Sequence, residues 1–220
     1  MYNLNLVFTR HKEMGNCNSF ELHRIIEMIR PEIIFEELSR PNYDKAYEEK
    51  SLITVESNAI KLYLQNHDIE HIPVDTYNLP DSYYENVGYM LRSLTDSIRS
   101  ESIYLRRLLD HQASLINQGG FNFLNSDQND EFMERIHNQR EIILNIINDE
   151  KLFQIANLEK EVIDKREDEI IDNVYNYSKE HVYNQAILFI GAGHRKSMIK
   201  KIDERKTQEK TEINWIFVNS

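Results

Sequence analysis

The sequence predicts an α/β protein with a central, mostly parallel sheet of about five strands flanked by helices. Short apolar segments rich in β-branched residues alternate with amphipathic helical segments near both ends of the chain. Between them, residues 82–180 carry almost only helical patterns. We therefore expect a single α/β domain over residues 1–220, with a long helical insertion at 82–180 between the third and fourth strands.

The first part of the chain has a β-α-β-α-β pattern. Ser19 is a good helix N-cap for the first helix, and Pro31 ends that helix because proline lacks a backbone donor. The second helix is expected over residues 55–66, where apolar residues recur at helical spacing. The three strands are expected at Leu4 to Phe8, Glu32 to Glu36 and Glu70 to Asp75.

Apolar residues in the insertion recur at spacings of three, four and seven, which predicts one long helix. These residues are Val87, Leu91, Leu94, Ile98, Leu105 and Leu108. The segment GGFNFLNSDQND should end this helix, and two more helices follow at about 131–147 and 152–180. The chain then returns to the sheet with a strand at 186–190, a helix at 195–205 and a strand at 213–218.

Composition narrows the class of protein. The formal net charge is −11, with 40% hydrophobic and 29% charged residues, which is typical of a soluble globular protein and argues against nucleic acid as a partner. The basic residues after His194 are interspersed with acidic ones, so we interpret them as a solvated helix face. Cys17 is the only cysteine. We find neither a signal peptide nor an apolar run long enough to span a membrane, so we expect a cytoplasmic protein with no membrane partner.

Candidate functional residues follow the ends of the predicted strands. Functional groups of a parallel sheet collect beyond the carboxyl ends of its strands. His11, Asp75 and His194 stand there, together with Glu36 or Glu37, which an extended backbone directs to opposite faces. Two readings stay open for His11, Glu37 and His194, which could either bind a divalent metal or share proton transfer.

The stretch AILFIGAGH ends with a histidine beyond two glycines. Gly191 and Gly193 allow a tight turn from strand to helix, but the chain lacks the further glycines of a dinucleotide or phosphate-binding loop. His194 then lies at a helix N-terminus, where the neutral imidazole is favoured. The alternative reading is a helix-capping or core histidine.

Two polar residues interrupt the apolar stripe of the last insertion helix. Arg166 and Asn173 share that face, so Arg166 is either buried against a carboxylate or part of a solvated seam. In contrast, a further cluster that straddles the turn before the third strand could be drawn as a metal site, but we interpret it as surface polar residues. Its members are His67, Asp68, Glu70 and His71.

The ordered motifs resemble the TraB/TIKI superfamily, which includes TraB/PrgY proteins, TIKI-type proteases, ChaN-like haem-binding proteins and erythromycin esterase-like hydrolases. LVFTRH is similar to its strand ending Gly-Thr-x-His, and RPEIIFEEL to its Pro-Asp-x-Val-x-x-Glu-Leu strand. Glu56 resembles the glutamate that opens the next helix, and Asp75 the aspartate that ends the following strand. Residues 166–174 resemble its Arg-Asp-x-x-Met-Ala-x-Asn helix, and GAGH matches its Gly-Ala-Gly-His.

The resemblance implies one pocket and a hydrolase-like chemistry. The residues that it brings together are His11, Glu37, Glu56, Arg166, Asn173 and His194. TIKI-type members use a divalent metal, here Mn, Co or Zn, whereas in esterase-like members a histidine activates water without one. Phe8, Glu167 and Ile170 depart from the family pattern, and residues 82–160 have no clear counterpart, so the chain is expected to be a divergent member.

Our leading hypothesis is a hydrolase that acts on a small molecule or a peptide. The expected catalytic residues are His11, Glu37, Glu56, Arg166 and His194, of which His11, Glu37 and His194 are the metal ligands if a metal is bound. The expected substrate-binding residues are Arg10, Glu36, Asp75 and Asn173. The alternative is a non-catalytic ligand-binding or signalling protein that uses the same pocket, with the insertion as a partner or homodimer surface.

Overall fold

The structure is a computed structural model that describes residues 2–218. Its five strands form one all-parallel sheet in the order β3-β2-β4-β1-β5. The strands are β1 (Tyr2–Thr9), β2 (Ile33–Glu36), β3 (Glu70–Pro73), β4 (Gln185–Gly191) and β5 (Ile213–Phe217). The predicted α/β class and the insertion between the third and fourth strands are both confirmed.

The strand register explains why the residues that follow β1, β2 and β4 lie at one edge of the sheet. β4 lies between β1 and β2, with Thr9 opposite Gly191 and Glu36 opposite Phe189. All three strands run in the same direction, so the residues that follow them emerge at one edge of the sheet.

Helices cover both faces of the sheet. One face packs against α1 (Ser19–Ile29) and α3 (Val55–Tyr63), through residues such as Leu22, Ile26 and Ile60. The other face packs against α7 (Glu150–Glu180) and α8 (Arg195–Lys206). A one-turn 3-10 helix, η1 (Ala192–His194), joins β4 to α8. Both apolar faces of the sheet are therefore buried, as its continuous apolar strands require.

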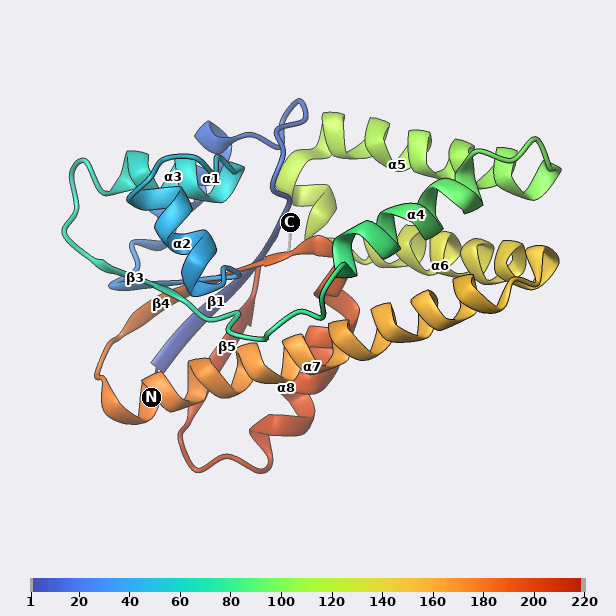
Figure 1. The fold of residues 1–220 in the computed structure, drawn as a ribbon. Helices are drawn as coiled ribbons and strands as arrows, with labels where there is room; N and C mark the ends of the chain where they lie inside the picture. The colour runs from blue at the N-terminus through green and yellow to red at the C-terminus, as the bar shows by residue number, and fades with distance from the viewer. Residues whose placement is uncertain (1, 219–220) are drawn as a thin grey trace.

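The insertion has an apolar cluster of its own. It contains α4 (Tyr83–Thr95), α5 (Ser100–Leu124), α6 (Asp127–Ile147) and the first half of α7, and it extends to one side of the sheet (Figure 1). Asn125, between α5 and α6, accepts a hydrogen bond from the Phe8 amide (2.8 Å) and donates one to the Phe8 carbonyl (2.9 Å). The insertion is thus hydrogen-bonded directly to the backbone of β1.

The structure corrects several predicted boundaries. The predicted helix through residues 87–108 is two helices, α4 and α5, separated by a turn in which Ile98 is 92% exposed. Arg106 donates to the Ser97 carbonyl (3.0 Å) and so satisfies an acceptor in this turn. The glycine-rich segment does interrupt the helix as predicted, because Gly120 takes a non-helical φ of 56° and α5 ends within the segment, at Leu124.

Three smaller corrections concern the N-cap of α1, an additional short helix and the end of β3. The N-cap of α1 is Asn18, whose side chain accepts from the Glu21 amide (3.0 Å), and Ser19 is the first helical residue. A short helix, α2 (Arg40–Tyr47), lies where no helix was predicted. β3 ends at Pro73 instead of Asp75, because its partner strand β2 ends at Glu36, although the Val74 amide still donates to the Glu36 carbonyl (2.9 Å). No helix within residues 2–218 combines the length and apolarity needed to cross a bilayer.

Candidate functional site

A first histidine–carboxylate pair lies at the end of β1. His11 Nδ1 is 3.2 Å from Glu56 Oε1, an oxygen that also accepts from the Thr9 hydroxyl (2.6 Å). Glu56 is buried in the first turn of α3, where a capping box between Thr54 and Ser57 fixes the helix start. The hydrogen bond with Glu56 raises the pKa of His11 to about 9, so the imidazolium form is favoured at neutral pH.

A second histidine–carboxylate pair lies beyond β4. His194 Nδ1 is 2.7 Å from Glu167 Oε1 of α7, which also accepts from the Ser197 hydroxyl (2.6 Å). An ionised carboxylate only accepts, so the geometry assigns a proton to Nδ1 and leaves Nε2 as the reactive nitrogen. Burial opposes protonation of His194, but the hydrogen bond to Glu167 and the charge of Glu37 raise its pKa above the ordinary value.

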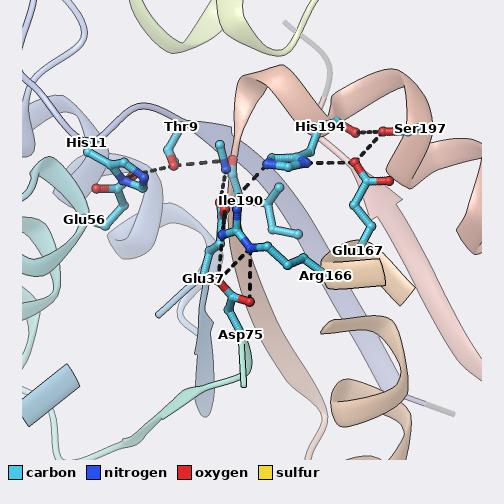
Figure 2. A network of polar contacts seen from close by, with 11 residues as sticks. Thr9, His11, Glu37, Glu56, Asp75, Arg166, Glu167, Ile190, His194 and Ser197 are labelled. Carbon is cyan, nitrogen blue, oxygen red and sulfur yellow. Dashed lines mark hydrogen bonds and ion pairs between the residues drawn. The ribbon is translucent and has the colours of Figure 1, made fainter. Parts of the chain in front are cut away.

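An arginine connects two carboxylates between the pairs. Arg166 Nη2 is 3.0 Å from Glu37 Oε1 and 2.6 Å from Asp75 Oδ2, and Arg166 Nε also donates to Asp75. The second oxygen of Glu37 accepts from the Gly191 amide (2.6 Å), and His194 Nε2 lies 3.6 Å from Glu37 Oε1. Figure 2 shows this group with one histidine pair on each side. Burial lowers the pKa of Arg166, but Asp75 and Glu37 outweigh it and raise that pKa, so the guanidinium stays charged.

Of the two readings of Arg166, the structure has the buried one, since its side chain is only 13% exposed and carries carboxylate partners. Asn173, on the same face of α7, points elsewhere: it donates to the Val74 carbonyl and the Thr76 hydroxyl, both at 2.9 Å. Asn173 therefore stabilises the segment that follows β3. The carboxylate of Asp75 is already bound by Arg166.

Glu36 and Glu37 point in different directions, as their consecutive positions predict. Glu36 accepts from the Tyr47 hydroxyl (2.6 Å) and lies 2.8 Å from His71 Nδ1. His71 was predicted at the surface, yet its side chain is only 14% exposed. The reason is the pairing of β3 with β2, which places His71 beside the buried Glu36.

A small cavity lies between the first pair and the Glu36–Glu37 turn, lined by Thr9, His11, Glu56 and both glutamates, with room for about one water molecule. Among the described residues, Glu56 Oε2 is buried and has no hydrogen-bond partner. A larger groove of about 360 Å³ opens on the other side of His11, between the Gly191–Gly193 turn and helices α5 and α6. Arg10 and His11 both line this groove.

The donor set does not fit a divalent metal in this arrangement. Both oxygens of Glu37 are already engaged, one by the cationic Arg166 and one by the Gly191 amide. Within residues 2–218 no three histidine, cysteine, aspartate or glutamate side chains are grouped closely enough to hold a metal ion. The metal remains a prediction of the resemblance, and no chemical step below depends on it.

Three site residues were missing from the predicted set: Thr9, Glu167 and Ser197. Glu167 stands where the related motif has an acidic residue beside its arginine, which was the available signal. Thr9 and Ser197 carry no signal of their own, because hydroxyl residues are common at strand ends and in first helical turns.

Comparisons of the chain with protein-family models, curated proteins and solved structures find no match.

Proposed function

We propose that the protein is a histidine-based hydrolase of esters, of the TraB/TIKI, erythromycin esterase-like type. The observation that carries this proposal is the pair of histidine–carboxylate contacts, His11–Glu56 and His194–Glu167, on either side of the Glu37–Arg166 ion pair. Histidines oriented by buried carboxylates are suited to general acid–base chemistry.

In this proposal the two histidines have different roles. His194, when neutral, accepts a proton at Nε2 from a water molecule whose oxygen attacks the ester carbonyl carbon. Glu167 holds the ring through Nδ1 and stabilises the imidazolium that forms. His11, protonated at neutral pH, donates its proton to the leaving alkoxide, which departs as the alcohol. The carboxylic acid is the second product. His194 then releases its extra proton to solvent and His11 takes one up from solvent, so that over the full cycle water is divided between the two products.

The Glu37–Arg166–Asp75 group orients the base. Arg166 lies between the Glu37 and Asp75 carboxylates and reduces their repulsion of each other and of any developing oxyanion. Glu37 Oε1 faces His194 Nε2, so it stabilises the imidazolium after proton transfer. Through its other oxygen, Glu37 also fixes the Gly191 amide at the start of the GAGH turn.

The test is ester hydrolysis by the protein after dialysis against a chelator. We expect hydrolysis above the buffer rate that survives the chelator and is lost in His194→Gln. The variant His181→Gln, at an exposed histidine on the C-terminal end of α7, should retain the wild-type rate and controls for the substitution itself. Hydrolysis that is equally fast in His194→Gln would overturn the proposal.

The same preparation decides between the metal and metal-free alternatives. Elemental analysis of the wild type, His11→Ala and His194→Ala should find no stoichiometric divalent metal in any of them, before or after reloading. A metal retained near one equivalent by the wild type and lost in both variants would contradict histidine-only chemistry and favour the metal-dependent alternative.

A second candidate function is a ligand-binding or signalling role in which the insertion contacts a partner or a second copy. The observation that favours it is a set of exposed apolar side chains on the insertion: Tyr84, Tyr89, Leu91, Ile98, Tyr104, Ile142 and Ile146. Light scattering during size-exclusion chromatography tests the homodimer. A monomeric mass at high micromolar concentration would contradict the proposal that this surface forms a homodimer.

A further inference from the structure

The groove beside His11 continues along the insertion. It shares Met133, Ala192 and Gly193 with a neighbouring groove, also of about 360 Å³, that lies between α6 and the start of α8. Volumes of this size are typical of small-molecule sites. One wall is the Gly191–Gly193 turn, and the opposite wall comes from α5 and α6 of the insertion.

The walls nearest His11 are apolar. They are formed by Met14, Leu109, Ala113, Ile116, Leu124 and Met133. Methionine side chains are unbranched and adapt to irregular apolar ligands. The polar side chains on this wall partner each other, since Gln112 Nε2 donates to Asn129 Oδ1 (3.1 Å). An apolar ligand would therefore bury surface here without leaving these groups unpaired.

The charges around the groove divide into paired and unpaired ones. In the neighbouring groove the charged side chains have partners: Lys196 with Glu134, Lys200 with Glu204, and Asp130 with Arg195. Beside His11, in contrast, Arg10 makes no ion pair with any carboxylate in the described part of the chain, and its Nη1 only contacts Met14 Sδ (2.8 Å). Arg10 is thus a cation without a carboxylate partner among the described residues at one end of an apolar groove, beside His11, whose protonated ring is paired with Glu56.

We infer that the groove binds the apolar acyl chain of an ester, and that Arg10 and His11 bind the carboxylate of the acid released. This inference rests on the proposed hydrolase function and adds its substrate class, an ester of a medium-chain aliphatic acid. The acyl chain lies along Met14, Ala113 and Met133. The insertion is then the wall that sets chain-length specificity.

Binding of the product is the test, because it does not require turnover. Octanoate is titrated calorimetrically into the wild type and into Ala113→Phe, which fills the groove from α5, and acetate serves as the short-chain comparison. Ser114→Phe places the same side chain at the next, exposed position of α5, outside the groove lining, and is the matched control. Circular dichroism and thermal unfolding establish that each variant is folded.

We expect octanoate to bind the wild type and Ser114→Phe equally, to bind Ala113→Phe at least tenfold more weakly, and to bind far more tightly than acetate. Arg10→Gln should weaken octanoate severalfold while leaving 1-octanol unchanged, since the alcohol carries no charge. No binding of octanoate to the wild type, or equal binding to Ala113→Phe, would overturn the inference.

The two proposals fail separately. If octanoate binds as expected but His194→Gln still hydrolyses esters like the wild type, the assignment of the groove as an acyl-chain site is retained and the proposed role of His194 in hydrolysis is wrong. If esters are hydrolysed through His194 but octanoyl and acetyl esters have the same KM in both the wild type and Ala113→Phe, the hydrolase stands and the groove assignment is wrong.

Discussion

The two histidine–carboxylate pairs differ chiefly in their access to solvent. The His11 side chain is 57% exposed and lines both the groove and the small cavity, whereas the His194 side chain is 16% exposed. Their carboxylate partners, Glu56 and Glu167, are both buried. A buried ring held through Nδ1 has a fixed orientation, as a base must have, and an exposed ring with a high pKa can deliver a proton to a departing group.

The largest expected effect separates these two roles. His194→Gln should lower kcat/KM for an activated ester by about 10³-fold or more, because the base is lost. His11→Gln should cost far less with a p-nitrophenyl ester, whose leaving group needs no proton, than with an ethyl ester. Steady-state kinetics with both esters measure the difference. An equal loss with the two esters in His11→Gln would contradict the acid role.

The next effect concerns the carboxylate behind the base. Glu167→Gln should lower kcat by about 10²-fold, since an amide no longer specifies the Nδ1–H tautomer. Glu167 raises the pKa of His194, so its loss lowers that pKa. The acidic limb of the pH–rate profile, where His194 loses its proton, should therefore move to lower pH. Glu180→Gln, at an exposed glutamate at the end of α7, controls for the substitution. A reduced rate with an unmoved acidic limb would indicate a structural role only.

The substitution Glu56→Gln, at the His11–Glu56 pair, should affect the alkaline limb of the pH–rate profile. In the wild type, rate should fall as pH rises through about 9, where His11 loses the proton that it donates. Glu56→Gln removes the hydrogen bond that raises this pKa, so the falling limb should move down toward about 6.5, the usual histidine value. The NMR titration of the His11 ring measures the same shift without turnover. A His11 pKa that stays near 9 in Glu56→Gln would contradict the pairing.

The sequence predicts one pair better than the other. His11 and His194 were predictable because each follows a strand, and parallel strands bring their ends to one edge. Glu56 was predictable only through the resemblance to the TraB/TIKI motif. Glu167 was not placed in the site, because its contact depends on the rotation of α7 about its own axis against a turn 27 residues further along the chain. Helical periodicity defines a buried face but not which neighbouring element covers it.

The same limit applies outside the pairs. Arg166 was expected to be buried if a carboxylate partner was present, and the sheet edge supplies Glu37 and Asp75 from two different strand ends. His71 was misplaced at the surface, since local polarity does not reveal that β3 pairs with β2 and brings it to Glu36. Asn125 bonds Phe8 across 117 residues of chain, and no local pattern predicts such a contact.

The smallest expected effect tests the turn that lies beside the buried pair. A Cβ added at Gly191 would lie 3.3 Å from Glu37 Oε2 and 3.7 Å from His194 Cδ2, and φ at this residue is −56°, which any residue adopts. Gly191→Ala should therefore fold normally, with little change in Tm. Its methyl group should displace the Glu37 carboxylate, which faces His194 Nε2, by a few tenths of an ångström and lower kcat by about fivefold to tenfold.

Gly193→Ala is the comparison for this substitution, because its Cβ would lie 3.8 Å from Met133 Cε, an ordinary contact at the groove wall. It should raise KM for an octanoyl ester more than it lowers kcat, whereas Gly191→Ala should lower kcat at nearly constant KM. If the two variants instead changed kcat and KM alike, the turn would not separate base orientation at Gly191 from chain binding at Gly193. The buried histidine pair would then lose its distinct role as the oriented base.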